Sequence, residues 1–261
     1  MTQQLVIDHV SKVFGGLKAV ADVTMTIEQG TLIALIGPNG AGKTTLFNML
    51  TGESGPSSGT ITLYTADGPV DITKKKAYQV AKLGVARTFQ NIRLFGAMTV
   101  KENVLVARTH LYRESFIGTM LRLPQFYQQE AAVATAADEL LDFFELADVA
   151  DEPTASLPYG TQRRVEIVRA VATKPQLLFL DEPVAGMNPE ETADLGRLIT
   201  RIREHFGSTV VLIEHDMSLV MKLAESIYVL DHGAMIASGT PNEIQTNAQV
   251  ISAYLGGENH A

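Results

Sequence analysis

Short apolar runs separated by polar loops recur along the chain and predict a mixed α/β fold. Three runs are apolar almost throughout, as in strands buried within a parallel sheet: TLIALIG (31–37), QLLFLDEP (176–183) and STVVLIEH (208–215). Near the N-terminus, LVIDHV (5–10) and VTMTI (23–27) are also predicted to be strands, with FGGLKAV (14–20) as the loop between them.

Glycines and alternating patterns predict the elements between these strands. PNGAGKTTLFNMLTG (38–52) is a glycine loop followed by a helix that Gly52 can end. GTITLYTADGPVDIT (59–73) is predicted to be a hairpin that turns at Asp67 and Gly68. The remaining predictions are a short helix in KKKAYQVAKLG (74–84), helices near 189–206 and from Asp216, a hairpin at 227–239 and a helical C-terminal tail.

The middle of the chain changes character, because its apolar residues recur at helical spacing from about residue 90 to residue 164. TVKENVLVAR (99–108) and EAAVATAADELLDFFEL (130–146) are the clearest helices there. The predicted architecture is therefore a parallel α/β core interrupted by a helical insertion.

Composition narrows the class of protein. The chain has 261 residues, 46% hydrophobic and 19% charged, which suits a packed core in one large domain. The net charge of -8 disfavours nucleic acid as the main partner, since binding to a phosphate backbone is typical of basic surfaces. There is no cysteine, no signal-peptide pattern in MTQQLVIDHV, and no apolar run near the ~20 residues that span a bilayer. We therefore expect any work at a membrane to be done from outside the lipid.

The segment GPNGAGKT (37–44) fits the phosphate-loop pattern G-x-x-x-x-G-K-[ST] and lies between a predicted strand and a predicted helix. Gly40 and Gly42 let successive N–H groups face a phosphate, Lys43 can reach the β- and γ-phosphates, and the Thr44 hydroxyl can bind Mg²⁺. A glycine-rich turn with an incidental lysine is the alternative, which the strand–loop–helix context disfavours. The predicted ATP-binding set is Gly37, Pro38, Asn39, Gly40, Ala41, Gly42, Lys43, Thr44 and Thr45.

Polar groups at the ends of two apolar strands supply the candidate metal site and base. Asp181 ends LLFLD and is predicted to hold Mg²⁺, directly or through water, while Glu182 is the candidate general base for the attacking water. His215 follows STVVLIE and could position that water, and Gln90 could sense the γ-phosphate. Taken alone, His215 would be an incidental histidine and Gln90 an ordinary loop glutamine. Their occurrence in the same chain as the phosphate loop and the acidic strand end favours the functional interpretation.

The segments GPNGAGKTT, TFQNIRLF, LPYGTQRR, LLFLDEP and LIEHD follow the order found in ATP-binding cassette (ABC) ATPases, which the whole chain resembles. The resemblance implies a RecA-like P-loop core with an antiparallel β-subdomain (1–89 and 166–261) and an inserted helical subdomain (90–165), together one ABC ATPase domain. It also implies roles: Phe14 stacks on adenine, Gln90 is the Q-loop residue that reaches Mg²⁺, and residues 157–161 are the signature, whose Gly160 contacts the partner's ATP. Lys43, Gln90, Glu182 and His215 are then the catalytic set.

A narrower resemblance is to the LivG type of branched-chain amino-acid importer ATPase, through ARTFQNIRLFGAMTVKENV, YGTQRRVEI and EPVAGMNPEET. It implies an ATPase peripheral to the cytoplasmic face of the inner membrane that energises uptake through a separate permease. The implied partners are the permease subunits, a second ABC ATPase subunit (the same chain or a related one) and, indirectly, a solute-binding protein. Importers of urea or amides, a nucleotide-sensing module, a soluble ABC ATPase and a small-molecule kinase are the alternatives.

The signature segment departs from the Leu-Ser-Gly-Gly-Gln of the general family. Pro158 has neither hydroxyl nor N–H, Tyr159 replaces a glycine and Thr161 an amide, while Asn188 stands where an aspartate is usual. Two interpretations are open. In one, this chain forms an asymmetric ATPase pair in which one ATP site is altered; in the other, these residues are a variation of the subfamily without catalytic consequence. For permease docking, the candidates are Ile92, Leu94 and Phe95, with FIGTMLRLPQF (116–126) as an extension; the alternative is that both segments fold onto their own subdomain.

Overall fold

The computed structural model describes residues 2–111 and 124–256, which divide into two compact units. The core unit comprises residues 1–87 and 176–261, and the helical unit comprises residues 88–175. The predicted boundary between residues 165 and 166 is wrong, because it falls inside helix α6 (Tyr159–Ala172). Hydrogen bonds between successive turns keep such a helix whole, so all of it belongs to the helical unit.

The core unit contains a six-stranded sheet in the order β10-β9-β3-β8-β7-β6. β3, β6, β7, β8 and β9 are parallel, and β10 pairs with β9 in the antiparallel sense. Every residue of β3, β7 and β8 is buried, which confirms the three predicted core strands. The bounds are β3 Leu32–Ile36, β6 Val85–Arg87, β7 Leu177–Asp181, β8 Thr209–Ile213, β9 Ser226–Asp231 and β10 Ala234–Gly239.

A second, antiparallel sheet has the order β2-β1-β4-β5, formed by β1 Gln3–Phe14, β2 Leu17–Glu28, β4 Ser58–Thr65 and β5 Gly68–Asp71. The predicted loop at 14–20 is wrong, because β1 and β2 continue to a pair between Phe14 and Leu17. Gly15 and Gly16 both have positive φ and form the tight turn that the sequence pattern spread over seven residues. The β4–β5 hairpin is confirmed, but its turn lies at residues 66 and 67 rather than at Asp67 and Gly68, because Gly68 already pairs with Thr65.

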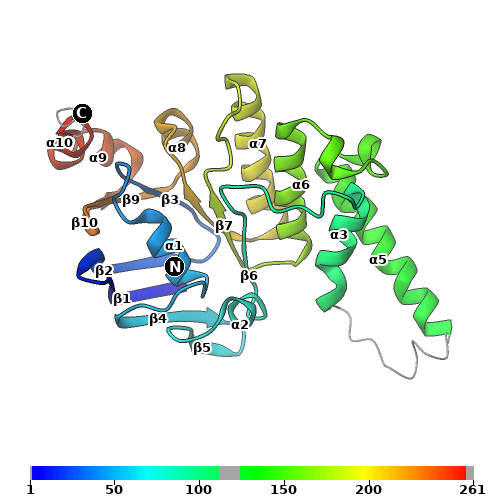
Figure 1. The fold of residues 1–261 in the computed structure, drawn as a ribbon, viewed down its shortest axis with the longest axis horizontal. Helices are drawn as coiled ribbons and strands as arrows, with labels where there is room; N and C mark the ends of the chain where they lie inside the picture. The colour runs from blue at the N-terminus through cyan, green and yellow to red at the C-terminus, as the bar shows by residue number, and fades with distance from the viewer. Residues whose placement is uncertain (1, 112–123, 257–261) are drawn as a thin grey trace. The chain divides into compact units, whose positions relative to one another are not determined.

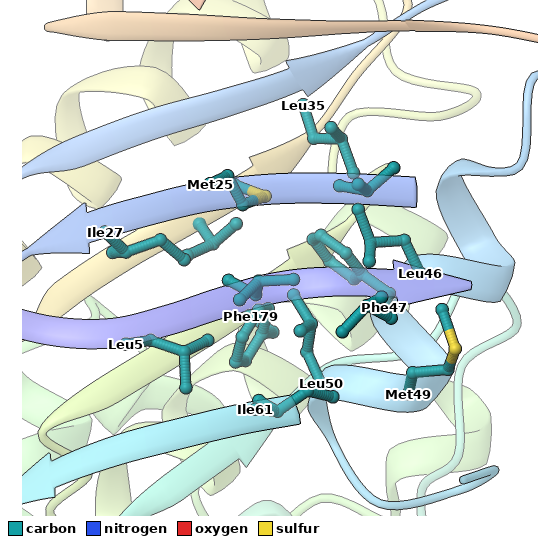
Figure 2. Close-up of a cluster of buried hydrophobic side chains, with 14 of the residues drawn as sticks. Leu5, Met25, Ile27, Leu35, Leu46, Phe47, Met49, Leu50, Ile61 and Phe179 are labelled. Atoms are coloured by element: carbon teal, nitrogen blue, oxygen red, sulfur yellow. The ribbon is translucent and has the colours of Figure 1, made fainter. Parts of the chain in front are cut away.

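Helix α1 (Lys43–Leu50) is held by the main hydrophobic core of this unit. Figure 2 shows its Leu46, Phe47, Met49 and Leu50 among side chains from both sheets. Phe47 meets Phe179 of β7 edge to face, with ring centroids 5.0 Å apart. Since α1 directly follows the glycine loop, this packing sets where the loop lies.

Further helices complete the core unit: α2 Ala77–Ala81, α7 Pro189–Phe206, α8 Met217–Leu223, α9 Pro241–Gln245 and α10 Ala248–Gly256. α7 and α8 pack against each other (Figure 1). α7 begins at the N-cap Asn188 and ends at Gly207, whose left-handed φ of 64° suits a helix C-terminus. The predicted helices near 189–206 and after Asp216 are therefore confirmed.

The helical unit contains α3 (Val100–Arg108), α5 (Pro124–Phe143) and α6, with short 3-10 turns at Thr109–Leu111, Ala147–Val149 and Thr154–Ser156. α3 packs on both α5 and α6. Most of the segment 116–126, the proposed extension of the docking surface, lies outside the described residues. Across residues 2–111 and 124–256, no helix combines the length and apolarity needed to cross a membrane.

Candidate active site

The glycine loop joins β3 to α1 and has a backbone that only glycine adopts easily at several positions. Gly37, Gly40 and Gly42 have φ values of 148°, 79° and 98°. A Cβ at Gly37 would overlap the carbonyl oxygen of Leu230, and one at Gly42 would overlap that of Ala19. Close packing of the loop against β9 and β2 therefore requires glycine at these two positions, in addition to the requirement of the positive φ.

Two alanine substitutions separate packing from backbone strain in this loop. At Gly40, a Cβ meets no atom of the described residues within 4 Å, so Gly40→Ala bears only the positive-φ cost of about 1–2 kcal/mol. Gly37→Ala adds the overlap with Leu230, so we expect it to lower the free energy of unfolding by clearly more than Gly40→Ala. Urea unfolding of the two variants measures the difference, and equal losses would contradict this interpretation of the loop.

Lys43 begins α1 and is buried, with its ammonium turned back into the loop. Its Nζ donates to the carbonyl oxygens of Gly37 (2.7 Å) and Pro38 (2.9 Å). Burial lowers the pKa of Lys43, and the negative charges of Glu182 and Asp181 oppose that shift. These two acids are therefore close enough to act on the lysine, which joins the predicted loop and the predicted strand end into one site.

The N-terminus of α1 is suited to an anion. Its first turn reads KTTL and carries no acid, and within the described part of the chain no side chain caps it. Thr44 is exposed there and Thr45 half-buried. Free N–H groups and the positive end of the helix dipole favour a phosphate at such a position.

Asp181 ends β7 as a buried carboxylate that is held by an arginine. The Arg87 guanidinium donates to Asp181 Oδ2 at 2.6 Å and to Asn48 Oδ1 of α1 at 2.6 Å, and it lies 3.2 Å from Thr51 Oγ1. Sequence analysis missed Arg87, because its partners lie 36 or more positions away. The arginine ties the acidic strand end to the helix that follows the glycine loop.

Glu182 and His215 face each other across neighbouring strands. Glu182 Oε1 lies 2.9 Å from His215 Nε2, and the two side chains are 18% and 40% exposed. β7 and β8 are parallel neighbours with Asp181 paired to Ile213, so the residues that follow each strand meet at one sheet edge. Glu182 has a φ of 47°, an uncommon conformation for a residue other than glycine and one often found at functional sites.

Glu214, which sequence analysis also missed, is a buried acid beside this pair. Its two oxygens accept from the backbone N–H groups of Val184 (3.1 Å) and His215 (3.0 Å). Burial raises the pKa of Glu214, and the accepted N–H bonds oppose the shift. An acid that closes the apolar run STVVLIE was the signal that could have revealed it. It joins the segments that follow β7 and β8.

The other predicted site residues belong to other segments of the chain. Phe14, next to the β1–β2 turn, is 52% exposed, and the Lys12 ammonium lies 5.1 Å from its ring centroid. Gln90 is exposed in the loop before α3, and Gly160 lies in the first turn of α6. Their contacts with nucleotide stay predictions.

The residues that depart from the general family, in the signature segment and at position 188, have local bonding roles. Pro158 is the N-cap of α6, and the Tyr159 hydroxyl lies 3.0 Å from an Arg163 nitrogen. Asn188 Oδ1 accepts from the N–H groups of Glu190 (2.9 Å) and Glu191 (3.0 Å), so it caps α7. Asparagine performs this capping as well as aspartate does, so the departure at Asn188 is harmless for the helix.

A strand–glycine loop–helix with a buried lysine beside an acidic strand end defines a P-loop nucleotide-binding protein. The family described as ABC transporter matches residues 20–185, and the one described as branched-chain amino acid ATP-binding cassette transporter matches residues 234–260. The chain belongs to the ABC transporter family, in the class of its ATP-binding proteins.

Individual relatives match almost the whole chain. It is 45% identical to the high-affinity branched-chain amino acid transport ATP-binding protein LivG of Salmonella typhimurium LT2 and to BraF of Pseudomonas aeruginosa PAO1, each over 93% of this chain and 94% of the relative. A crystal structure of the ADP conformation of MJ1267, an ATP-binding cassette of an ABC transporter, has a TM-score of 0.82 and 29% identity, covering 98% of this chain and 100% of that one. These similarities confirm the predicted ABC-type fold.

Proposed function

We propose that this chain is the ATP-hydrolysing subunit of an ABC importer that takes up branched-chain amino acids through a separate permease. The contact between Glu182 and His215, beside Asp181 and Lys43, carries the proposal for hydrolysis. The 45% identity to LivG and BraF supports the choice of solute. Importers of urea or amides remain the alternative.

The core unit provides the groups that would hold Mg-ATP. In the core unit, the N–H groups of the glycine loop and Lys43 would bind phosphate, and Thr44 and Asp181 are the proposed metal ligands. The ABC resemblance adds Gln90 as a further proposed ligand. Among the described residues, no group of three or more His, Cys, Asp or Glu side chains is arranged to hold a metal ion by itself. Mg²⁺ sites commonly use one or two carboxylates plus phosphates and waters, so Asp181 and a hydroxyl suit it. When bound, the ion would supply positive charge that offsets the charge of the phosphates.

The acid–histidine pair supplies the proposed proton chemistry. Glu182 Oε1 is positioned to accept a proton from the attacking water, and the His215 imidazole orients that carboxylate through the 2.9 Å contact. Glu214 keeps both segments in place by accepting an N–H from each. Because Lys43 is buried with its ammonium aimed at the loop, it offsets phosphate charge in a site of reduced dielectric.

Docking to a permease is proposed for the segment that follows Gln90. Phe95 is 48% exposed, although its backbone N–H donates to Asn103 Oδ1 and its carbonyl accepts from Thr154 Oγ1. Its ring packs against the Arg169 guanidinium, 5.5 Å from the centroid. An apolar ring presented on a fixed backbone suits a contact with a partner helix. The proposed partners are the permease subunits and a second ABC ATPase subunit, and binding to them would hold this chain peripherally at the cytoplasmic face of the membrane.

Uptake by the assembled transporter tests the function. The chain, co-purified with its permease and partner ATPase and reconstituted with its solute-binding protein, is expected to support ATP-dependent uptake of leucine, isoleucine and valine, with urea uptake at background. A matched preparation with ATP replaced by a non-hydrolysable analogue is the control. Uptake of urea without branched-chain amino acids would replace the proposed solute, and uptake that does not require ATP would end the proposal.

A further inference from the structure

A buried ion pair on α6 lies beneath the loop that carries Gln90. Arg163 Nη1 donates to Glu166 Oε2 at 2.7 Å, and the two side chains are 0% and 2% exposed. An ion pair removed from water in this way is stabilising only when good geometry and further hydrogen bonds offset the loss of hydration. The groups that supply those bonds therefore indicate what the pair is for.

The further bonds go to the backbone on both sides of Gln90. Arg163 donates to the carbonyl oxygens of Phe89 and Gln90, each at 2.7 Å. Glu166 Oε1 accepts from the N–H groups of Phe89 (3.4 Å) and Arg93 (3.3 Å). Residues 88–98 contain no helix or strand, so their backbone polar groups depend on such side chains for partners. The pair therefore supplies hydrogen bonds that a helix or strand would otherwise give to this loop backbone, while Gln90 itself stays exposed.

The same arginine also reaches the signature segment. Arg163 Nη2 lies 3.0 Å from the Tyr159 hydroxyl, and the guanidinium lies 5.7 Å from the centroid of that ring. Tyr159 is the first residue of α6, directly before Gly160. One guanidinium thus connects the backbone of Gln90 with the residue that replaces a signature glycine.

We propose that Arg163 and Glu166 are positioning residues that hold the Gln90 loop and residues 157–161 together as one rigid piece. This inference rests on the proposed function, in which Gln90 serves the ATP held by this chain and Gly160 serves the ATP of the partner subunit. The two groups then move together, so a shift that withdraws Gln90 from one ATP also displaces Gly160 from the other. Residues 88–93 and 157–161 both belong to the helical unit, which the chain enters between Arg87 and Thr88.

Amide hydrogen exchange on the full-length chain tests the link without nucleotide. Arg163→Lys keeps a positive charge beside Glu166 and loses the forked donation, so we expect exchange in residues 88–93 and in 157–161 to rise together by at least tenfold. The matched control is Arg164→Lys, because Arg164 is the next residue and contacts Glu145 at 3.4 Å. The control should leave both segments unchanged. Faster exchange in one segment alone would overturn the proposal.

Tyr159→Phe keeps the ring and removes only the hydroxyl, so it tests the coupling even if Arg163→Lys does not fold. In the assembled transporter we expect it to lower kcat for ATP about tenfold with KM unchanged, because the phosphate loop is intact. Equal kcat and KM to the parent would overturn the coupling through Tyr159. The exchange experiment uses the isolated chain without nucleotide, so its result does not depend on the proposed ATPase activity. A failure of the proposed function can therefore be distinguished from a failure of the proposed link.

Discussion

Replacing Glu182 by glutamine is expected to lower the ATP hydrolysis rate by about 10²–10⁴-fold, the usual contribution of a general base. The amide is close in size to the carboxylate and can still contact His215 Nε2, so the segment after β7 should keep its conformation. What is lost is the oxygen that accepts a proton from water. Because Lys43 and the glycine loop are unchanged, ATP affinity should stay near that of the parent.

The measurement is steady-state phosphate release by the assembled transporter, with ATP affinity determined separately by equilibrium binding. Glu190→Gln is the matched control, since Glu190 is an exposed acid in the first turn of α7. Its ATPase activity should equal that of the parent. Undiminished hydrolysis by the Glu182→Gln protein would remove Glu182 from the catalytic set and favour a nucleotide-sensing role instead.

Replacing Lys43 by alanine is expected to weaken ATP binding by roughly 10–100-fold, because a hydrogen bond to a charged group contributes about 1.5–3 kcal/mol. The loss has a second cause in this structure. The ammonium donates to the carbonyl oxygens of Gly37 and Pro38, and removing it leaves the curl of the loop less supported before any phosphate arrives.

Equilibrium titration with ATP and with AMP measures the effect. Because Lys43 is predicted to reach the β- and γ-phosphates, ATP should lose more affinity than AMP, which lacks both. Lys82→Ala serves as the control, since Lys82 is an exposed lysine just after α2. Unchanged ATP affinity in the Lys43→Ala protein would show that this loop does not hold the triphosphate.

Local patterns were sufficient for the elements that carry the predicted site. The glycine loop was predictable because its function depends on consecutive residues. The buried strands β3, β7 and β8 were predictable because each is apolar almost throughout. The turn between β1 and β2 was predicted wrongly as a long loop. There, β1 and β2 stay paired up to Phe14 and Leu17, so the two glycines between them form only a tight turn.

The residues that sequence analysis missed share one property: each is bonded to groups that only the folding of the chain brings near it. Arg87 contacts Asp181, 94 positions away, and Arg163 contacts Gln90, 73 positions away. Nothing in the local pattern separates such arginines from solvated ones. Only a folded interior, where an unpaired charge is costly, determines which charged residues must meet.

The sequence by itself determined the class of fold, the phosphate loop, and the identity of the acid and histidine that follow two core strands, since these depend on consecutive residues. The tertiary structure decided that Glu182 and His215 lie 2.9 Å apart, that Glu214 joins their segments, and that the helical unit includes all of α6. The physical reason is that strand order and burial are properties of the whole chain. A motif specifies which groups are available, and packing between distant segments decides which of them meet.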